Sequence, residues 1–238
     1  MPTDIQYALM AGASYISTRS EINQLPLPSG WVETKHANPP DGSGFEAITF
    51  ESQCSNEIVI SYAGTYDKDI TGDIAADFGL ATGGGSAQLL QAAEYYLSIK
   101  NDPRYQGDNI TLTGHSLGGG LAALVGVFFG VQAVTFDQAP FAQTARFKAN
   151  DLRTELSAIL DTNGNRRYSD ATLAPLASYI DQQQAAIFPA SGIPNSNLVS
   201  TIRVDGEFLS VAPIGAFASI GTPATPLHHG PAGLLGAF

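Results

Sequence analysis

The chain has 238 residues, which is long enough for one sizeable domain with a real hydrophobic core. Hydrophobic residues make up 44% and charged residues only 14%, which excludes a charged disordered chain, a coiled coil and a collagen-like repeat. The 22 acidic residues outnumber the 11 basic ones, and the longest basic run is Arg166-Arg167, so we expect neither nucleic acid nor an anionic membrane surface as a partner.

The N-terminal part predicts one helix and then two strands. Small and apolar residues recur at helical spacing over residues 5–16. A proline-rich connector at 26–40 follows, holds the only tryptophan, Trp31, and ends at a turn signal. Residues 45–50 and 58–62 are apolar runs separated by a polar stretch, the pattern of a β-hairpin.

The central part predicts a strand, a helix and a second strand. Residues 64–85 have no clean period and are expected to form a long loop or lid, with at most one short helix. Ser86 is a candidate cap for a helix at 87–100. A short strand at 110–113, a charge-free helix at 117–129 and a strand at 131–136 then imply a right-handed crossover and a parallel sheet.

A membrane span is considered and set aside. The nearly uncharged stretch at 117–134 contains five glycines and strand-like flanks, so a buried helix followed by a buried strand explains it better, and we expect no stable membrane insertion. Further helices are expected at 143–160 and 169–188, with a last strand at 199–204 and irregular coil from Val211 onward. These elements predict a single α/β domain over residues 1–238, with a mostly parallel central sheet flanked by helices.

Disulfide, metal and targeting signals are sparse. Cys54 is the only cysteine and is expected to be a buried or half-buried thiol. No Cys/His cluster suggests zinc, the oxygen-rich loop at 161–165 lacks the spacing of a calcium loop, and we expect no cofactor. The N-terminus has neither a basic start nor an apolar core segment, so no secretory signal peptide is expected, and export would need a signal-independent route.

The strongest motif is a nucleophile elbow at residues 114–118, which read G-x-S-x-G. A predicted strand precedes it and an apolar helix follows, which is the context that the motif requires. Ser116 is therefore the candidate nucleophile, on a tight turn where glycines remove side chains that would collide with backbone. The backbone N–H of Leu117, at the start of the helix, is a candidate donor to an oxyanion.

A serine nucleophile needs a base, and the chain has four histidines. His115 adjoins Ser116 across the turn and is expected to make a packing or polar contact, and His36 is expected at the surface. His228 and His229 remain, and we favour His229 slightly because Gly230 follows it. The alternative is that this chain is truncated at its C-terminus and that the true base lies beyond Phe238.

Four segments together resemble the class 3 lipases of the α/β-hydrolase superfamily. Residues 112–122 resemble the family's elbow, 58–65 its oxyanion strand, 133–136 the strand after the nucleophile helix and 204–210 the stretch with the acid. The resemblance covers roughly residues 45–230. Residues 7–15 are also similar to bacterial lipases that carry downstream calcium-binding repeats, which this chain lacks.

The resemblance implies the remaining site residues. The backbone N–H of Thr65 would be the second oxyanion donor, and Glu207 would be the acid that orients the base, although the family more often has aspartate there. Asp205 and Asp137 are the alternative acids.

The resemblance also implies the activity, which is hydrolysis of carboxylic esters of lipids through an acyl-serine intermediate, as in a triacylglycerol lipase or esterase. The competing hypotheses are a phospholipase, an acyltransferase or peptidase on the same scaffold, and a non-catalytic lipid-binding fragment without a base. Residues 66–80 could form an amphipathic flap over the site. Four phenylalanines could line an acyl site, although core packing explains them better: Phe128, Phe129, Phe136 and Phe141. The oligomeric state is open.

Overall fold

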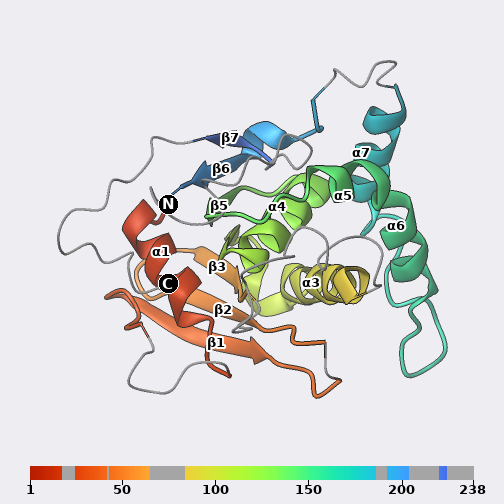
Figure 1. Ribbon diagram of the computed structural model, residues 1–238. Coiled ribbons are helices and arrows are strands. Elements are labelled where there is room, and N and C mark those ends of the chain that lie inside the picture. Colours follow the sequence, from red (N-terminus) through yellow and green to blue (C-terminus); the bar gives the residue numbers. More distant parts are fainter. Residues whose placement is uncertain (18–24, 42, 65–83, 186–191, 204–219, 224–238) are drawn as a thin grey trace.

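The computed structural model describes residues 1–17, 25–41, 43–64, 84–185, 192–203 and 220–223 (Figure 1). A seven-stranded sheet runs through them, with the strands in sequence order. The strands are β1 (Trp31–Ala37), β2 (Ala47–Ser52), β3 (Glu57–Tyr62), β4 (Asn109–His115), β5 (Ala133–Phe136), β6 (Val199–Ile202) and β7 (Thr222–Pro223). The first three pair antiparallel and the pairs from β3 to β7 are parallel, which confirms the mostly parallel α/β sheet.

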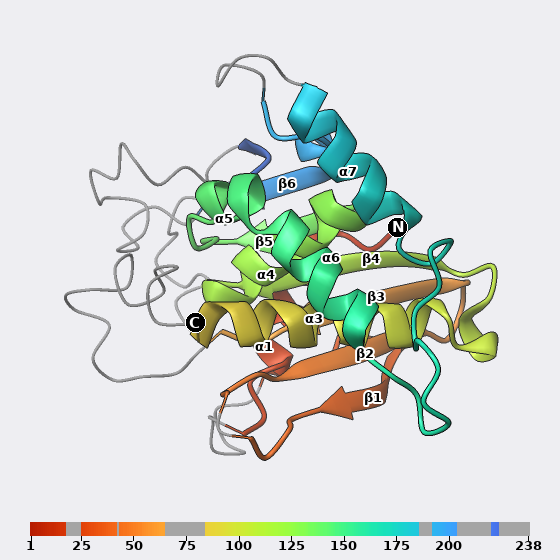
Figure 2. The ribbon, with the colours of Figure 1, turned by 90° about the vertical axis from the view of Figure 1, so that its right-hand side faces the viewer.

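Helices cover both faces of this sheet. The helices are α1 (Asp4–Ala13), α3 (Gly84–Lys100), α4 (Leu117–Phe129), α5 (Ala142–Phe147), α6 (Ala149–Ala158) and α7 (Ala174–Ala185), with 3-10 turns η2 (Pro103–Tyr105) and η3 (Ser196–Leu198). Helix α1 lies on one side, and α3 to α7 lie on the other, as the two perpendicular views show (Figures 1 and 2). Each side has its own buried apolar cluster, so both faces of the central strands are shielded from water.

The charge-free stretch folds as its composition predicts. Every residue of α4 is buried, and the chain passes from β4 through α4 into the parallel strand β5. Gly130 ends α4 with φ +68°, a left-handed conformation that glycine adopts without strain. Among the described residues, no helix combines the length and the apolar character that crossing a bilayer needs.

The proline-rich connector contains a strand that the sequence pattern did not predict. Trp31 to Ala37 form β1, which pairs antiparallel with β2 across a bulge between Glu33 and Lys35. The prolines of the connector flank this segment and none lies inside it, so its backbone N–H groups are free to pair. Trp31 is buried against the α1 side of the sheet.

The helix expected at 143–160 is two helices. α5 ends at Phe147 and α6 begins at Ala149, with Lys148 between them. The carbonyl of Ala145, which would accept the bond that continues one helix, accepts a hydrogen bond from the hydroxyl of Tyr179 at 2.8 Å. Lys148, with φ −102° and ψ −4°, is both the C-cap of α5 and the N-cap of α6.

Four smaller expectations also need correction. The helix expected from 169 begins at Ala174, where Pro175 suits the first turn, and residues before it form a turn closed by Ser169. The first helix ends at Ala13 rather than at 16. Cys54 is exposed, because the β2–β3 hairpin turn carries it. A short further strand, β7, follows β6, so the strand at 199–202 is not the last.

Candidate active site

Ser116 occupies the turn between β4 and α4 with φ 54° and ψ −122°, a backbone conformation that residues with a side chain rarely adopt. Strain of this kind costs on the order of 1–3 kcal/mol and persists only where the surroundings enforce it. Here the N–H of Ser116 donates to the carbonyl of Phe136 at 3.0 Å, and its carbonyl accepts from Ala139 at 2.9 Å and from Gly120 at 3.0 Å. The predicted elbow is therefore present and tightly held.

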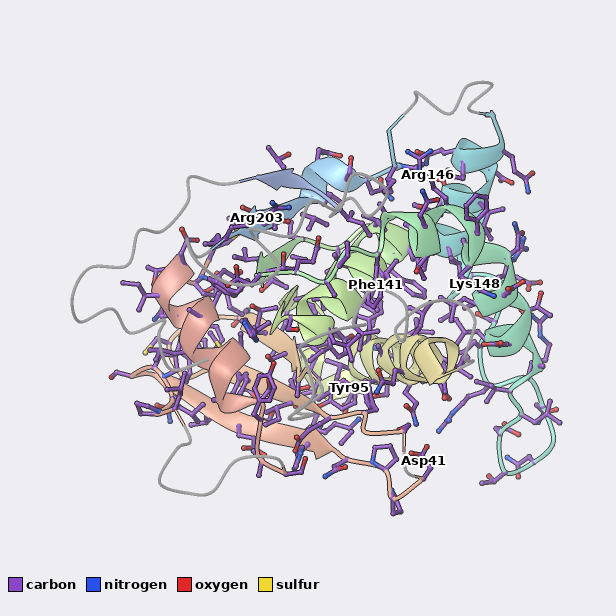
Figure 3. All side chains as sticks on the ribbon, in the orientation of Figure 1. Asp41, Tyr95, Phe141, Arg146, Lys148 and Arg203 are labelled. Carbon is purple, nitrogen blue, oxygen red and sulfur yellow. The ribbon has the colours of Figure 1, made fainter. Side chains whose placement is uncertain are left out.

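Glycines make this turn possible by removing side chains where two backbones meet. A methyl group at Gly118 would overlap the carbonyl of Tyr62 at the end of β3, and one at Gly114 would overlap the backbone of Gly118. A methyl group at Gly120 would overlap the ring of Phe141, which precedes α5 and lies beside α4 (Figure 3). The pattern G-x-S-x-G-G-G thus packs the first turn of α4 directly against two strands.

The start of α4 offers N–H groups to a developing negative charge. The first hydrogen bond of α4 runs from the N–H of Gly120 to the carbonyl of Ser116. The N–H of Leu117 precedes this bond, and N–H groups in the first turn of a helix have no acceptor within the helix. The end of β3 lies alongside, because a methyl group at Gly64 would be 3.5 Å from the Leu117 nitrogen. Thr65, the second expected donor, follows directly but lies outside the described residues.

The histidines divide between the described and the undescribed parts of the chain. The ring of His115 makes a polar contact, as expected, because its Nδ1 lies 3.1 Å from the Tyr15 hydroxyl. His36 is exposed as expected, and its Nε2 lies 2.8 Å from the buried carboxylate of Glu46. His228 and His229 lie outside the described residues.

The acid candidates divide in the same way. Asp137 is buried at the carboxyl end of β5 with φ 41°, and its N–H donates to the carbonyl of Ile202 at 3.0 Å. Glu207 and Asp205 lie outside the described residues. β6 is parallel to β5 and ends at Ile202, at the edge of the sheet that carries Ser116. Asp205 follows three residues later in the chain.

Gln138, which the sequence did not single out, binds the segment that leads into β7. Its buried Oε1 accepts from the N–H of Ile220 at 2.9 Å, and the hydroxyl of Thr201 donates to the Ile220 carbonyl at 3.0 Å. β7 begins two residues later and is parallel to β6. The strand therefore runs toward the same edge as β4, and His228 and His229 follow it in the chain.

Replacing Gln138 with leucine is expected to lower the free energy of unfolding by about 1–3 kcal/mol, since the buried N–H of Ile220 loses its acceptor. Ester hydrolysis should fall as well if the base follows β7. Urea unfolding measures the first effect and a p-nitrophenyl ester assay the second. Gln182→Leu, at an exposed site on α7, is the matched control. Equal stability of the two variants would contradict the assigned role.

Other sequence-based candidates lie away from the elbow or outside the description. Residues 66–80, the expected flap, lie outside the described residues. The four phenylalanines are core residues: Phe128, Phe129 and Phe141 are buried on the α4 side and Phe136 on the α1 side. The carboxylate of Asp161 accepts from the N–H groups of Asn163 and Asn165, which is the geometry of a solvated turn. The described residues contain no cluster of side chains suited to a metal ion.

A cavity of about 540 Å³ lies between the end of β1, α3 and Arg167. Figure 3 labels two of its residues, Asp41 and Tyr95. Two contacts join polar groups of its lining, because Gln91 donates to Asp41 at 2.6 Å and Arg167 lies 3.3 Å from Glu94. No residue of the elbow lines this cavity, so it is separate from the candidate site.

A parallel sheet with a serine elbow between β4 and α4 places the chain in the α/β-hydrolase class of proteins. Residues 7–161, more than half of the chain, match the model of the Tle-like phospholipase domain, and the chain belongs to this phospholipase-like family. The expected α/β-hydrolase fold is confirmed, and the family match supports the resemblance to lipases in general, while membership of the class 3 lipases stays a prediction.

Individual relatives agree with this assignment. The extracellular phospholipase A1 of Serratia liquefaciens is 33% identical over 132 residues, which cover 54% of this chain and 38% of that protein. The chain therefore spans less than two fifths of that relative. The crystal structure of the lipase from Rhizopus microsporus var. chinensis matches with a TM-score of 0.51 at 14% identity, over 88% of this chain and 68% of that one, which supports the fold alone.

Proposed function

We propose that this chain hydrolyses carboxylic acyl esters of lipids, with phospholipids as the favoured substrate class. The observation that carries the proposal is Ser116, held with φ 54° at the crest between β4 and α4, beside the N–H of Leu117. The family match and the phospholipase A1 of Serratia liquefaciens support the phospholipid over a neutral acylglycerol. The sequence alone favoured triacylglycerol, with phospholipid as the alternative.

The proposed reaction has two halves. The Ser116 oxygen attacks the ester carbonyl carbon while an imidazole accepts its proton, and the carbonyl oxygen becomes an oxyanion that the N–H groups of Leu117 and Thr65 stabilise. The carbon–oxygen bond to the alcohol then breaks, and the imidazole returns the proton to the leaving lysolipid. Water, deprotonated by the same imidazole, next attacks the acyl-serine, and the bond between the acyl carbon and the Ser116 oxygen breaks. The imidazolium returns its proton to the Ser116 oxygen as the fatty acid leaves.

The base and the acid follow from position in the chain. His229 or His228 is the proposed base, because β7 runs toward the Ser116 edge of the sheet just before them. Glu207 is the proposed acid, with Asp205 and Asp137 as alternatives, since β6 ends at the same edge. This arrangement keeps the order nucleophile, acid, histidine that α/β hydrolases use.

A fluorophosphonate probe tests the proposal, because it modifies only an activated serine. Mass spectrometry should locate the adduct on Ser116, and the wild-type protein should release fatty acid from phosphatidylcholine vesicles. His229→Ala and His228→Ala, compared side by side, should assign the base, since only one should abolish labelling.

Vesicle binding without labelling or turnover would instead identify a non-catalytic lipid-binding module. Transfer of the acyl group to an added alcohol in preference to water would identify an acyltransferase.

A further inference from the structure

Tyr15 connects the α1 side of the molecule to the elbow. It follows the C-terminal end of α1 and is only 4% exposed. Its hydroxyl lies 3.1 Å from Nδ1 of His115 and 3.3 Å from the carbonyl oxygen of the same residue. A methyl group at Gly64 would come within 2.5 Å of this hydroxyl, so Tyr15 also borders the end of β3. The phenol therefore lies where β3 and the elbow meet.

These contacts act on the peptide that leads into Ser116. The carbonyl of His115 and the N–H of Ser116 belong to one planar group, and rotation of that plane changes φ of Ser116. The phenol has a single hydrogen, which it donates to the His115 carbonyl, and Nδ1–H of the imidazole can then donate to the phenol oxygen. The opposite end of the same plane is held by the bond from Ser116 N–H to Phe136.

The backbone on both sides of Tyr15 is anchored. Before it, the Ser14 hydroxyl donates to the carbonyl of Ala11 at 2.8 Å. After it, Ser17 donates to the carboxylate of Glu46 through its hydroxyl at 2.7 Å and through its N–H at 3.1 Å. The Glu46 side chain is only 3% exposed, and its backbone carbonyl accepts from Ala63, the residue before Gly64. The phenol thus has little freedom to move away from the elbow.

We propose that Tyr15 is a positioning residue that holds the His115–Ser116 peptide in the orientation that catalysis needs. The inference rests on the proposed function of Ser116 as nucleophile. It predicts an effect on the chemical step and little effect on substrate binding, because the phenol acts through the elbow backbone. It also assigns the hydrogen of the His115 ring to Nδ1, where it faces the phenol oxygen.

The test compares Tyr15→Phe with Tyr7→Phe. Tyr7 is an equally buried tyrosine of the α1 side, and its hydroxyl donates to Thr111 at 3.0 Å, away from the elbow. Tyr15→Phe should lower kcat by about 10- to 100-fold with KM within about twofold, whereas Tyr7→Phe should keep both constants. Nitrogen NMR of the His115 ring should show Nδ1 protonated in wild type and in Tyr7→Phe, and a changed tautomer ratio in Tyr15→Phe.

Two outcomes separate this inference from the proposed function. Unchanged kcat together with an unchanged His115 tautomer in Tyr15→Phe would overturn the positioning role, even if Ser116 proves to be the nucleophile. A wild-type protein without Ser116-dependent hydrolysis would instead refute the proposed function. In that case the NMR comparison still decides whether Tyr15 sets the tautomer of the His115 ring. The same tautomer ratio in Tyr15→Phe and Tyr7→Phe would reject that role of Tyr15.

Discussion

Replacing Ser116 with alanine is expected to lower kcat for a phospholipid or p-nitrophenyl ester by about 10⁴-fold or more. The reason is that the variant loses the hydroxyl of Ser116, the proposed nucleophile, while the N–H of Leu117 at the start of α4 remains. The fold should persist, because the bonds from Phe136 and Ala139 involve only the backbone of residue 116. Fatty-acid release and p-nitrophenol absorbance measure the loss.

Cys54→Ser provides the control for this substitution. Cys54 is the other nucleophilic side chain of interest, but it is exposed in the β2–β3 turn, away from the carboxyl edge of the parallel strands. Its replacement should leave kcat, KM and fluorophosphonate labelling unchanged. Substantial hydrolysis by Ser116→Ala, with a melting temperature equal to that of wild type, would show that another group carries the reaction.

Gly118→Ala is expected to destabilise the fold by about 3 kcal/mol or more, which places it among the largest effects of single substitutions. The added methyl group would overlap the carbonyl of Tyr62. Both partners are backbone, within a buried helix and a buried strand, so neither can rotate away as a flexible side chain would. Urea unfolding followed by circular dichroism measures the change, and a loss of soluble protein would be its extreme form.

Gly192→Ala tests whether the effect belongs to the site or to glycine in general. No heavy atom lies within 4 Å of a methyl group built at Gly192, and its φ is not positive. The free energy of unfolding of this variant should lie within about 0.5 kcal/mol of the wild-type value. A Gly118→Ala protein that is as stable as Gly192→Ala and retains full activity would contradict the close packing described for the elbow.

Local sequence patterns predicted the hairpin, the β4–α4–β5 crossover and the elbow. Each of these depends on neighbours in the chain: alternating apolar residues set the strands, a charge-free run set the buried helix, and glycines around Ser116 set the turn. The same local pattern placed Ser116 in the turn before α4 and Leu117 at the start of that helix, as the structure shows. Proline content concealed β1, because composition averaged over the connector does not show that its prolines lie only on the flanks.

Contacts between distant residues were not predictable in this way. The Tyr179 hydroxyl bonds the carbonyl of Ala145 in α5 from more than thirty positions away, and the Tyr15 hydroxyl reaches His115 across a separation of 100 residues. Gln138 meets Ile220 across 82 residues. No periodicity or motif encodes such pairs, since each partner has an ordinary local sequence.

By itself, the sequence determined the class of this protein: an α/β chain with a G-x-S-x-G motif between a strand and a helix. Only the tertiary structure decided that Phe136 in β5 and Ala139 after it bond the backbone of Ser116, and that Tyr15 at the end of α1 bonds the carbonyl of His115. The physical reason is that a strained backbone conformation is maintained by hydrogen bonds from segments far away in the chain.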